Sequence, residues 1–269
     1  MKITSSLIIA TYNWPAALRL CLESVKHQTI MPGEIIIADD GSGSETREVV
    51  DQFSKQFPIP VKHIWQPDEG YQLARIRNKA FAAASGAYLL QIDGDLILHP
   101  QFVKDHLDAA RPGTFVSGAR SLINKEMTER LLNDGKFTYA NINQSALGKK
   151  YNARRIGMLS RLYYLFQRGH GQVNYVLGCN MAFWKEDLFK VNGYNEEFSG
   201  WGREDNDIAV RLLNAGVELR FLKFGGIVYH LFHKETPRPG FSINEELFRK
   251  SLNKKTTFVP QGMNQYISL

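Results

Sequence analysis

Several features that would assign this sequence to a broad class are missing from it. Only two cysteines occur, Cys21 and Cys179, so neither a disulfide framework nor a cysteine-based zinc site fits, and a reducing compartment is the simpler interpretation. No apolar run reaches the roughly 18–20 residues that span a bilayer, and the early apolar stretch 7–10 is far shorter than the core of a signal peptide. We therefore expect a cytoplasmic protein.

Internal repeats and low-complexity tracts are also absent, and the 43% hydrophobic content is enough for one large folded unit. The net charge of +6 would attract nucleic acid, an anionic membrane or a diphosphate ligand, and charge alone does not choose among them. No nucleic-acid-binding motif accompanies the charge, so nucleic acid is not an expected partner.

Short apolar runs alternate with segments of helical spacing in the first 118 residues. Strands are predicted at 6–10, 34–38, 61–65, 87–92 and 114–117, and helices at 15–27, 44–56, 71–84 and 101–110. This alternation predicts an α/β fold whose mostly parallel sheet is built by right-handed crossovers, with ligands gathered at the carboxyl ends of the strands.

The second half is less regular. Residues 122–172 lose clear periodicity and become basic, which predicts a partly helical insertion. Order returns with strands at 176–182, 218–222 and 226–229 and helices at 185–191 and 204–214, the latter closed by Gly216. We divide one domain, 1–269, into a first half (1–118), an insertion (119–174), a second half (175–235) and a tail (236–269), of which we expect the part after Ser251 to be surface-laid or mobile.

Two acidic turns follow predicted strands and should face one crevice. In Asp93-Gly94-Asp95 the two carboxylates can both point at a divalent cation, while the small Gly94 lets phosphates approach the backbone. In Asp39-Asp40-Gly41-Ser42 a carboxylate can accept a hydrogen bond from the imide of uracil or from a ribose hydroxyl. Both stretches also fit ordinary turns and a helix N-cap, so that alternative stays open.

Two arginines on the helix at 71–84 are candidate diphosphate ligands. Arg77 is the preferred phosphate contact, whereas Arg75 fits a solvated helix face equally well.

A second group of candidate residues begins with Trp201 between two glycines and continues with Glu204 and Asp205 at a helix start. An indole face can stack on a sugar, and a carboxylate beside it can deprotonate an acceptor hydroxyl, although helix capping also explains acids at this position. His230 and His233 follow a predicted strand and could be structural or could provide a third metal ligand.

Together these residues resemble the family 2 glycosyltransferases of the GT-A fold over residues 5–118 and 175–235. The first-half matches are LIIATYN (7–13), IIADDGS (36–42), ARIRN (74–78) and QIDGD (91–95). The matches GCNMAF (178–183), NGYNE (192–196) and GWGREDND (200–207) look like the carboxyl-terminal region of β-1,4-galactosyltransferases and polypeptide N-acetylgalactosaminyltransferases.

The resemblance implies a nucleotide-sugar-binding first half and an acceptor-binding, catalytic second half. It implies that Asp205 is the catalytic base and Glu204 an acceptor-site acid, and that Asp95, Asp93 and His230 hold the metal. The implied nucleotide-sugar contacts are Thr11, Tyr12, Asn13, Asp39, Asp40, Arg77, Asp93, Gly94, Trp201 and Gly202. Two departures are Arg203, where the galactosyltransferases have glycine, and His233, a rival metal ligand.

The reaction implied is an inverting transfer of galactose, N-acetylgalactosamine or glucose from a UDP-sugar, with Mn2+ or Mg2+, to a glycan or lipid-linked glycan in polysaccharide or lipopolysaccharide synthesis. A nucleotidyltransferase would normally carry a Gly-rich basic loop after the first strand, where this chain reads TYNW (11–14). A non-catalytic nucleotide- or glycan-binding module would not need the adjacent Glu204 and Asp205.

The insertion contains a segment, 149–168, in which basic and large apolar residues alternate. Its basic residues are Lys149, Lys150, Arg154, Arg155, Arg161 and Arg168. Such a segment can lie on an anionic bilayer, at the inner face of the cell membrane, or pack on the core with its basic residues outward.

Overall fold

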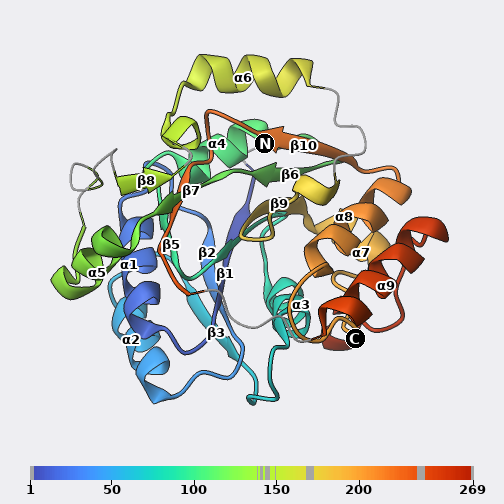
Figure 1. Ribbon diagram of the computed structural model, residues 1–269, viewed down its shortest axis with the longest axis horizontal. Helices are drawn as coiled ribbons and strands as arrows, with labels where there is room; N and C mark the ends of the chain where they lie inside the picture. Colours follow the sequence, from blue (N-terminus) through green and yellow to red (C-terminus); the bar gives the residue numbers. More distant parts are fainter. Residues whose placement is uncertain are drawn as a thin grey trace.

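The computed structural model describes residues 3–137, 139, 142, 146–148, 150–167, 173–234 and 240–267. Its centre is a seven-stranded sheet in the order β10-β6-β9-β4-β1-β2-β3 (Figure 1). The strands are β1 (Ser5–Thr11), β2 (Glu34–Asp39), β3 (Val61–Trp65), β4 (Tyr88–Asp93), β6 (Thr114–Gly118), β9 (Asn180–Trp184) and β10 (Glu218–Leu222). Only β9 pairs antiparallel with its neighbours, β4 and β6, so the predicted mostly parallel sheet is confirmed.

Helices cover both faces of this sheet because alternate side chains of its central strands are apolar on both sides. Leu7 and Ile9 of β1 pack with residues from α1 (Pro15–Lys26), α2 (Ser44–Ser54) and α4 (Phe102–Ala109). Ile8 packs on the opposite face with residues from α3 (Leu73–Ala83), α7 (Lys185–Val191) and α8 (Glu204–Asn214). The two cores fix the strand ends that carry the acidic turns.

A second, four-stranded sheet, β5-β11-β7-β8, was not predicted. It consists of β5 (Leu96–Leu98), β7 (Arg120–Ile123), β8 (Leu147–Gly148) and β11 (Val228–His230), and α5 (Lys125–Asp134) packs beside it. β11 pairs with β5 so that His230 lies opposite Leu96. This sheet brings the histidines near the end of the chain to the Asp93-Gly94-Asp95 turn.

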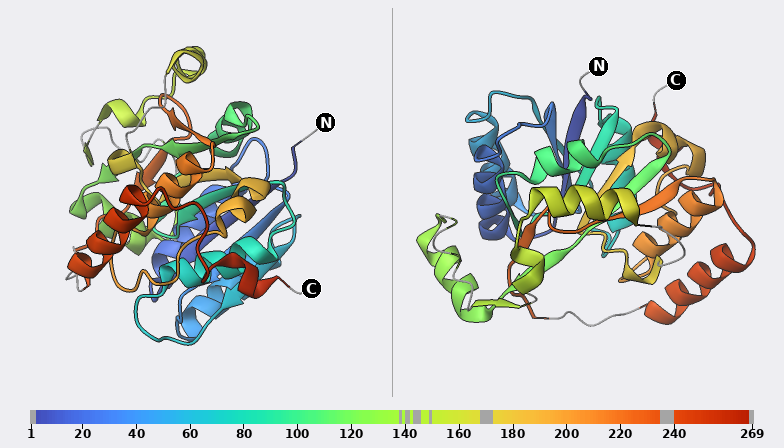
Figure 2. Two further views of the ribbon diagram at one scale, coloured as in Figure 1. Left: turned by 90° about the vertical axis from the view of Figure 1, so that its right-hand side faces the viewer. Right: turned by 90° about the horizontal axis from the view of Figure 1, so that it is seen from above.

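The predicted strand 176–182 is displaced: Asn180 N donates to Leu177 O at 3.1 Å in a turn, and β9 begins only at Asn180. The insertion forms, besides β7, α5 and β8, the short helices η3 (Lys150–Ala153) and η4 (Val173–Tyr175) and the helix α6 (Gly157–Phe166), which stands on the outside of the molecule (Figure 2).

The expectation of a surface-laid or mobile tail after Ser251 was wrong for Val259 and Met263, which are buried, whereas residues 252–258 lie mostly at the surface. α9 (Phe241–Asn253) packs beside α8, and η5 (Met263–Tyr266) packs against α3. Met263 is fully buried, and Asn192 Nδ2 donates to Val259 O at 2.8 Å. The end of the chain therefore contributes to the core.

Candidate active site

A pocket of about 430 Å³ opens at the carboxyl ends of β1 and β4. It is lined by Thr11, Tyr12, Asp40, Asp93, Gly94 and Asp95, together with Tyr71, His233 and others. The two acidic turns therefore face one crevice, as the strand pattern predicts. The backbone of β1 packs closely on Gly94, where a Cβ would lie 3.1 Å from Ala10 O.

The pocket lining includes an exposed aromatic side chain, Tyr12, and a buried acid, Asp40. Tyr12 is 51% exposed, and its hydroxyl donates to Asp68 at 2.9 Å. Asp40 is buried, accepts from Gln66 Nε2 at 2.6 Å and from the backbone N of Gln72 at 2.9 Å, and has a pKa raised by burial. The exposed Tyr12 ring offers a stacking surface for a base.

Two of the predicted nucleotide contacts hold the neighbouring loop instead of lining the pocket. Asp39 is fully buried, accepts from Ser42 N at 2.8 Å and pairs with His63 Nε2 at 2.8 Å. Asn13 accepts from Gly43 N at 3.0 Å. In the structure both side chains fix the loop that follows β2 and neither lines the pocket, so their contact with a nucleotide stays a prediction.

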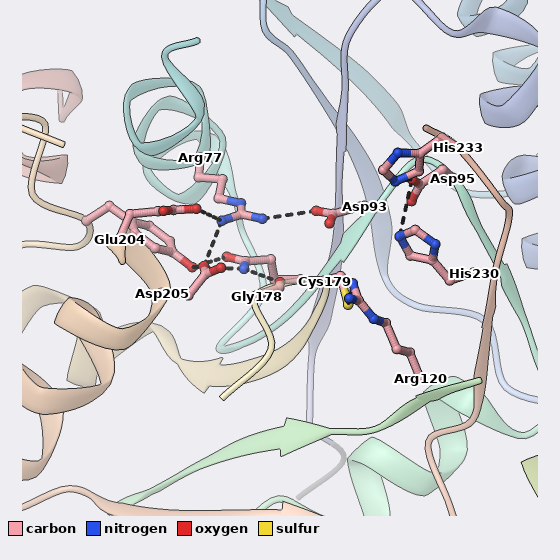
Figure 3. A network of polar contacts seen from close by, with 12 residues as sticks. Arg77, Asp93, Asp95, Arg120, Gly178, Cys179, Glu204, Asp205, His230 and His233 are labelled. Atoms are coloured by element: carbon pink, nitrogen blue, oxygen red, sulfur yellow. Dashed lines mark hydrogen bonds and ion pairs between the residues drawn. The ribbon is translucent and has the colours of Figure 1, made fainter. Parts of the chain in front are cut away.

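A carboxylate and two imidazoles converge beside the pocket (Figure 3). Asp95 Oδ2 lies 3.4 Å from His230 Nε2 and 3.5 Å from His233 Nε2. Burial raises the pKa of Asp95 to about 6 and lowers that of His230 to about 4. Asp95 Oδ1 is buried without a hydrogen-bond partner in the described part of the chain.

This arrangement changes the expected ligand set. His233, predicted as a rival to His230, lies with it around the Asp95 carboxylate. In the part of the chain described, these residues form the only set of three or more His, Cys, Asp or Glu side chains whose ligand atoms all lie within 4.8 Å of one another. Asp93 lies outside the group, because its Oδ1 accepts from Arg77 Nη2 at 3.0 Å. Its contact with metal or ribose stays a prediction.

Arg77 is at the centre of a buried ionic network. Its side chain is 1% exposed, donates from Nη1 to Asp205 Oδ1 at 2.8 Å and from Nη2 to Asp93, and lies 3.9 Å from Glu204. The guanidinium also lies 5.3 Å above the Tyr194 ring. This geometry favours a positioning role over the predicted phosphate contact, because carboxylates already occupy both terminal nitrogens.

Asp205 is held on one side and open on the other. Its Oδ1 accepts from Arg77 and, at 2.9 Å, from the hydroxyl of Tyr194, which in turn accepts from Gln91 Nε2 at 2.8 Å. Its side chain is 21% exposed. Oδ2 lies so close to Gly178 that a Cβ there would be 1.8 Å away. The carboxylate is therefore fixed in orientation and keeps one oxygen for chemistry.

The neighbouring acid, Glu204, is buried and has a strongly raised pKa. Glu204 is 6% exposed, and burial together with the negative charge of Asp205 raises its pKa to about 8. At neutral pH the side chain is therefore protonated and can donate a hydrogen bond, while Asp205 accepts. Both begin α8, as the capping pattern predicted.

The loop before α8 places Trp201 against α9. Its ring centroid lies 6.0 Å from that of Phe241, and Asn244 Nδ2 donates to Trp201 O at 3.4 Å. Gly202 has φ +99, and a Cβ there would be 3.3 Å from the Phe241 ring. Neither residue lines the pocket at the ends of β1 and β4. Their contact with the sugar stays a prediction.

Comparison with known families decides the class of this site. The model of glycosyl transferase family 2 matches residues 6–181, which include the nucleotide-side turns, Arg77 and Gly178. The chain belongs to glycosyl transferase family 2. A second model, described as the N-terminal domain of galactosyltransferase, matches residues 167–234 of this family 2 glycosyltransferase and so includes Trp201, Asp205 and both histidines.

Relatives and solved structures agree with this assignment. The chain is 29% identical to chondroitin synthase of Escherichia coli over 84% of its own length and 34% of the relative's. It is 26% identical to validoxylamine A glucosyltransferase of Streptomyces hygroscopicus subsp. limoneus over 80% and 49% of the two chains. This family 2 glycosyltransferase thus spans about a third to a half of these two relatives.

Solved structures share its GT-A fold. Residues 1–349 of S. aureus TarS in complex with UDP align with a TM-score of 0.65 at 14% identity over 98% of this chain and 68% of that one. GalNAc-T7 with UDP, GalNAc and Mn2+ aligns with a TM-score of 0.64 at 16% identity over 98% and 53%.

Sequence reasoning gave no role to several residues that shape the site. Tyr194 lies in a quoted motif and Gly178 in another, but only the fold shows that both touch Asp205. Arg120 of β7 was not singled out; its Nη1 lies 3.7 Å from Cys179 Sγ, and it has no acidic partner within 4 Å among residues with described positions. No local pattern distinguishes Arg120 from other arginines.

Proposed function

We propose that this protein transfers a hexose or N-acetylhexosamine from a UDP-sugar to a hydroxyl of a glycan or lipid-linked glycan, with inversion at the anomeric carbon. The observation that supports this most is the Asp205 carboxylate, which is oriented by Arg77 and Tyr194. Arg77 also bonds to Asp93, and Asp93 lines the pocket. An acid held this way is suited to take a proton from an acceptor hydroxyl.

The donor end is supported by the pocket at β1 and β4. The exposed ring of Tyr12 and the buried Asp40 provide a surface for a base, and TarS and GalNAc-T7, which share the fold, were solved with UDP. The match to the galactosyltransferase model favours galactose or N-acetylgalactosamine, and the validoxylamine relative keeps glucose as a candidate.

The group formed by Asp95, His230 and His233 fits a divalent cation. One carboxylate and two imidazoles are suitable ligands for Mn2+, and the unpartnered Asp95 Oδ1 offers a further coordination atom. Such a cation, when bound, supplies positive charge that neutralises the leaving diphosphate. We expect His233→Ala to weaken Mn2+ binding by about tenfold or more, as measured by titration calorimetry. Unchanged affinity would remove His233 from the ligand set.

In the proposed reaction the acceptor oxygen loses its proton to Asp205 Oδ2 and forms a bond to the anomeric carbon as the bond to UDP breaks. Protonated Glu204 donates a hydrogen bond to an acceptor oxygen. We expect the indole of Trp201, in the loop before α8, to stack on the sugar.

Asp205→Asn tests the base directly. The amide oxygen can still accept from Arg77 and Tyr194, while the NH2 group that replaces Oδ2 cannot take a proton. We expect UDP-sugar affinity to be unchanged and transfer to fall by about three orders of magnitude or more, measured as UDP release with acceptor. Transfer at the wild-type rate would refute the assignment of the base.

A screen of UDP-sugars for UDP release, with Mn2+ and with EDTA, tests the activity itself. Release from one donor that depends on Mn2+ is expected. Nucleotide binding without hydrolysis or transfer under any condition would favour a non-catalytic binding module.

A further inference from the structure

Helix α6 exposes large apolar residues on the face opposite the one that packs on the body of the molecule. Ser160 and Tyr164, one helical turn apart, are buried against the body. The opposite face carries Met158, Leu162 and Phe166, which are 78%, 44% and 79% exposed, and Leu165 extends this face. A surface helix normally places polar residues there, so the apolar face requires a partner.

The charge around this face has one sign. No aspartate or glutamate occurs from residue 135 to residue 185. Arg154 lies just before α6 and Arg161 lies within it, and both are exposed. Lys150 is the first residue of η3, which ends directly before Arg154. Lys149 and Arg168, the ends of the segment predicted to contact a membrane, lie outside the described residues.

A cavity of about 580 Å³ lies between α4 and α6, next to the apolar face. Two of its basic residues are neutralised, since Lys104 pairs with Asp108 and Arg155 with Asp105.

Its other two cations have no acidic partner. Arg111 donates to the backbone O of Ala110, and neither it nor Arg161 has a carboxylate within 4 Å in the described portion of the molecule. The cavity therefore carries unneutralised positive charge suited to an anionic headgroup.

We propose that α6 docks this protein on an anionic membrane, with the apolar face entering the interface and Arg111 and Arg161 binding lipid phosphates. An apolar stripe flanked by basic residues is the pattern of a helix that lies in the plane of a bilayer surface. No helix in the described chain is long and apolar enough to span a membrane. Figure 2 shows α6 end on, raised above the rest of the molecule.

The proposal is independent of sugar transfer, because no residue lines both the α6 cavity and the pocket at β1 and β4. Vesicle binding and UDP release can therefore fail separately.

Co-sedimentation with vesicles of phosphatidylcholine, with and without about one third phosphatidylglycerol, tests the proposal. We expect wild-type protein to bind the anionic vesicles and to be released at high salt. Leu162→Asp with Phe166→Asp should lower the partition coefficient by about tenfold or more, and Arg161→Glu by several-fold. UDP release without vesicles should stay at the wild-type rate in both.

Matched controls lie on other exposed helices. Ile243→Asp replaces a 65% exposed apolar residue of α9, and Lys125→Glu reverses a 65% exposed lysine of α5. Both should bind vesicles like the wild type. Equal binding by the α6 variants and the wild type would overturn the proposal. The proposal would also be overturned if the wild-type protein did not bind anionic vesicles, whether it is monomeric or self-associated through α6.

Discussion

Gly178 offers the sharpest test of how Asp205 is positioned. A Cβ at residue 178 would lie 1.8 Å from Asp205 Oδ2, whereas Cβ contacts under 3.0 Å essentially do not occur. Gly178 does not have the positive φ that disfavours alanine, so Gly178→Ala acts through this clash and not through backbone strain. The carboxylate must retreat by about 1 Å, a displacement that can cost roughly 100-fold in rate.

The retreat also weakens two hydrogen bonds. Asp205 Oδ1 would leave Arg77 Nη1, now at 2.8 Å, and the Tyr194 hydroxyl, now at 2.9 Å. Bonds to a charged group contribute about 1.5–3 kcal/mol each, so partial loss of the pair is consistent with a 100-fold effect. We expect kcat for transfer to fall by about two orders of magnitude while UDP-sugar affinity, measured by calorimetry, stays constant.

Gly43→Ala is the matched control, because a Cβ there has no atom within 4 Å and its φ is –72. It should leave kcat and the melting temperature near those of the wild type. If Gly178→Ala also kept kcat within about threefold, with donor affinity unchanged, Asp205 would not need the position it has here and the proposed base would be refuted.

Variants at three further positions test neighbouring features. Tyr194→Phe removes the donor to Asp205 and should lower kcat about tenfold without changing UDP-sugar affinity; an unchanged kcat would contradict the positioning role. Arg203 pairs with Glu245 at 2.6 Å and has a φ of 75. Arg203→Ala and Arg203→Gly both remove the ion pair, but only the glycine variant relieves the backbone strain of the positive φ. Urea unfolding should show Arg203→Gly to be more stable than Arg203→Ala by about 1 kcal/mol, and the reverse order would exclude strain. The pKa of Glu204 rises from 4.5 to about 8 on folding, so the stabilisation from this group is complete below pH 4.5 and is lost as the pH rises through 8. Glu204→Gln should therefore reduce the fall in melting temperature between pH 6 and pH 9. A fall as large as that of the wild type would contradict the raised pKa.

Local sequence patterns predicted the elements and the acidic turns because those depend on neighbours in the chain. The strand ends that carry Asp40 and Asp95 follow from apolar runs, and the start of α8 follows from its acids. The second sheet was missed although a strand at 226–229, overlapping β11, was predicted. β5 has only three residues, and its pairing with β11 joins segments more than 120 residues apart.

The same limit explains the altered roles within the site. The sequence predicts Arg77 as a phosphate contact, and only long-range packing buries it between Asp93 and Asp205. His230 and His233 read as alternatives, and β11 brings both to one carboxylate. A single sequence contains the residue types but not the distances between them.

The one antiparallel strand, β9, has a consequence for how this enzyme can vary. Ile92, next to Asp93, pairs with Asn180, two residues after Gly178, so a single rung of backbone hydrogen bonds sets the distance between the donor side and the base side of the site. The basic insertion leaves the sheet after β6 and returns at β9, which pair with each other. The length and surface of the insertion can therefore change without altering the spacing of Asp93 and Gly178.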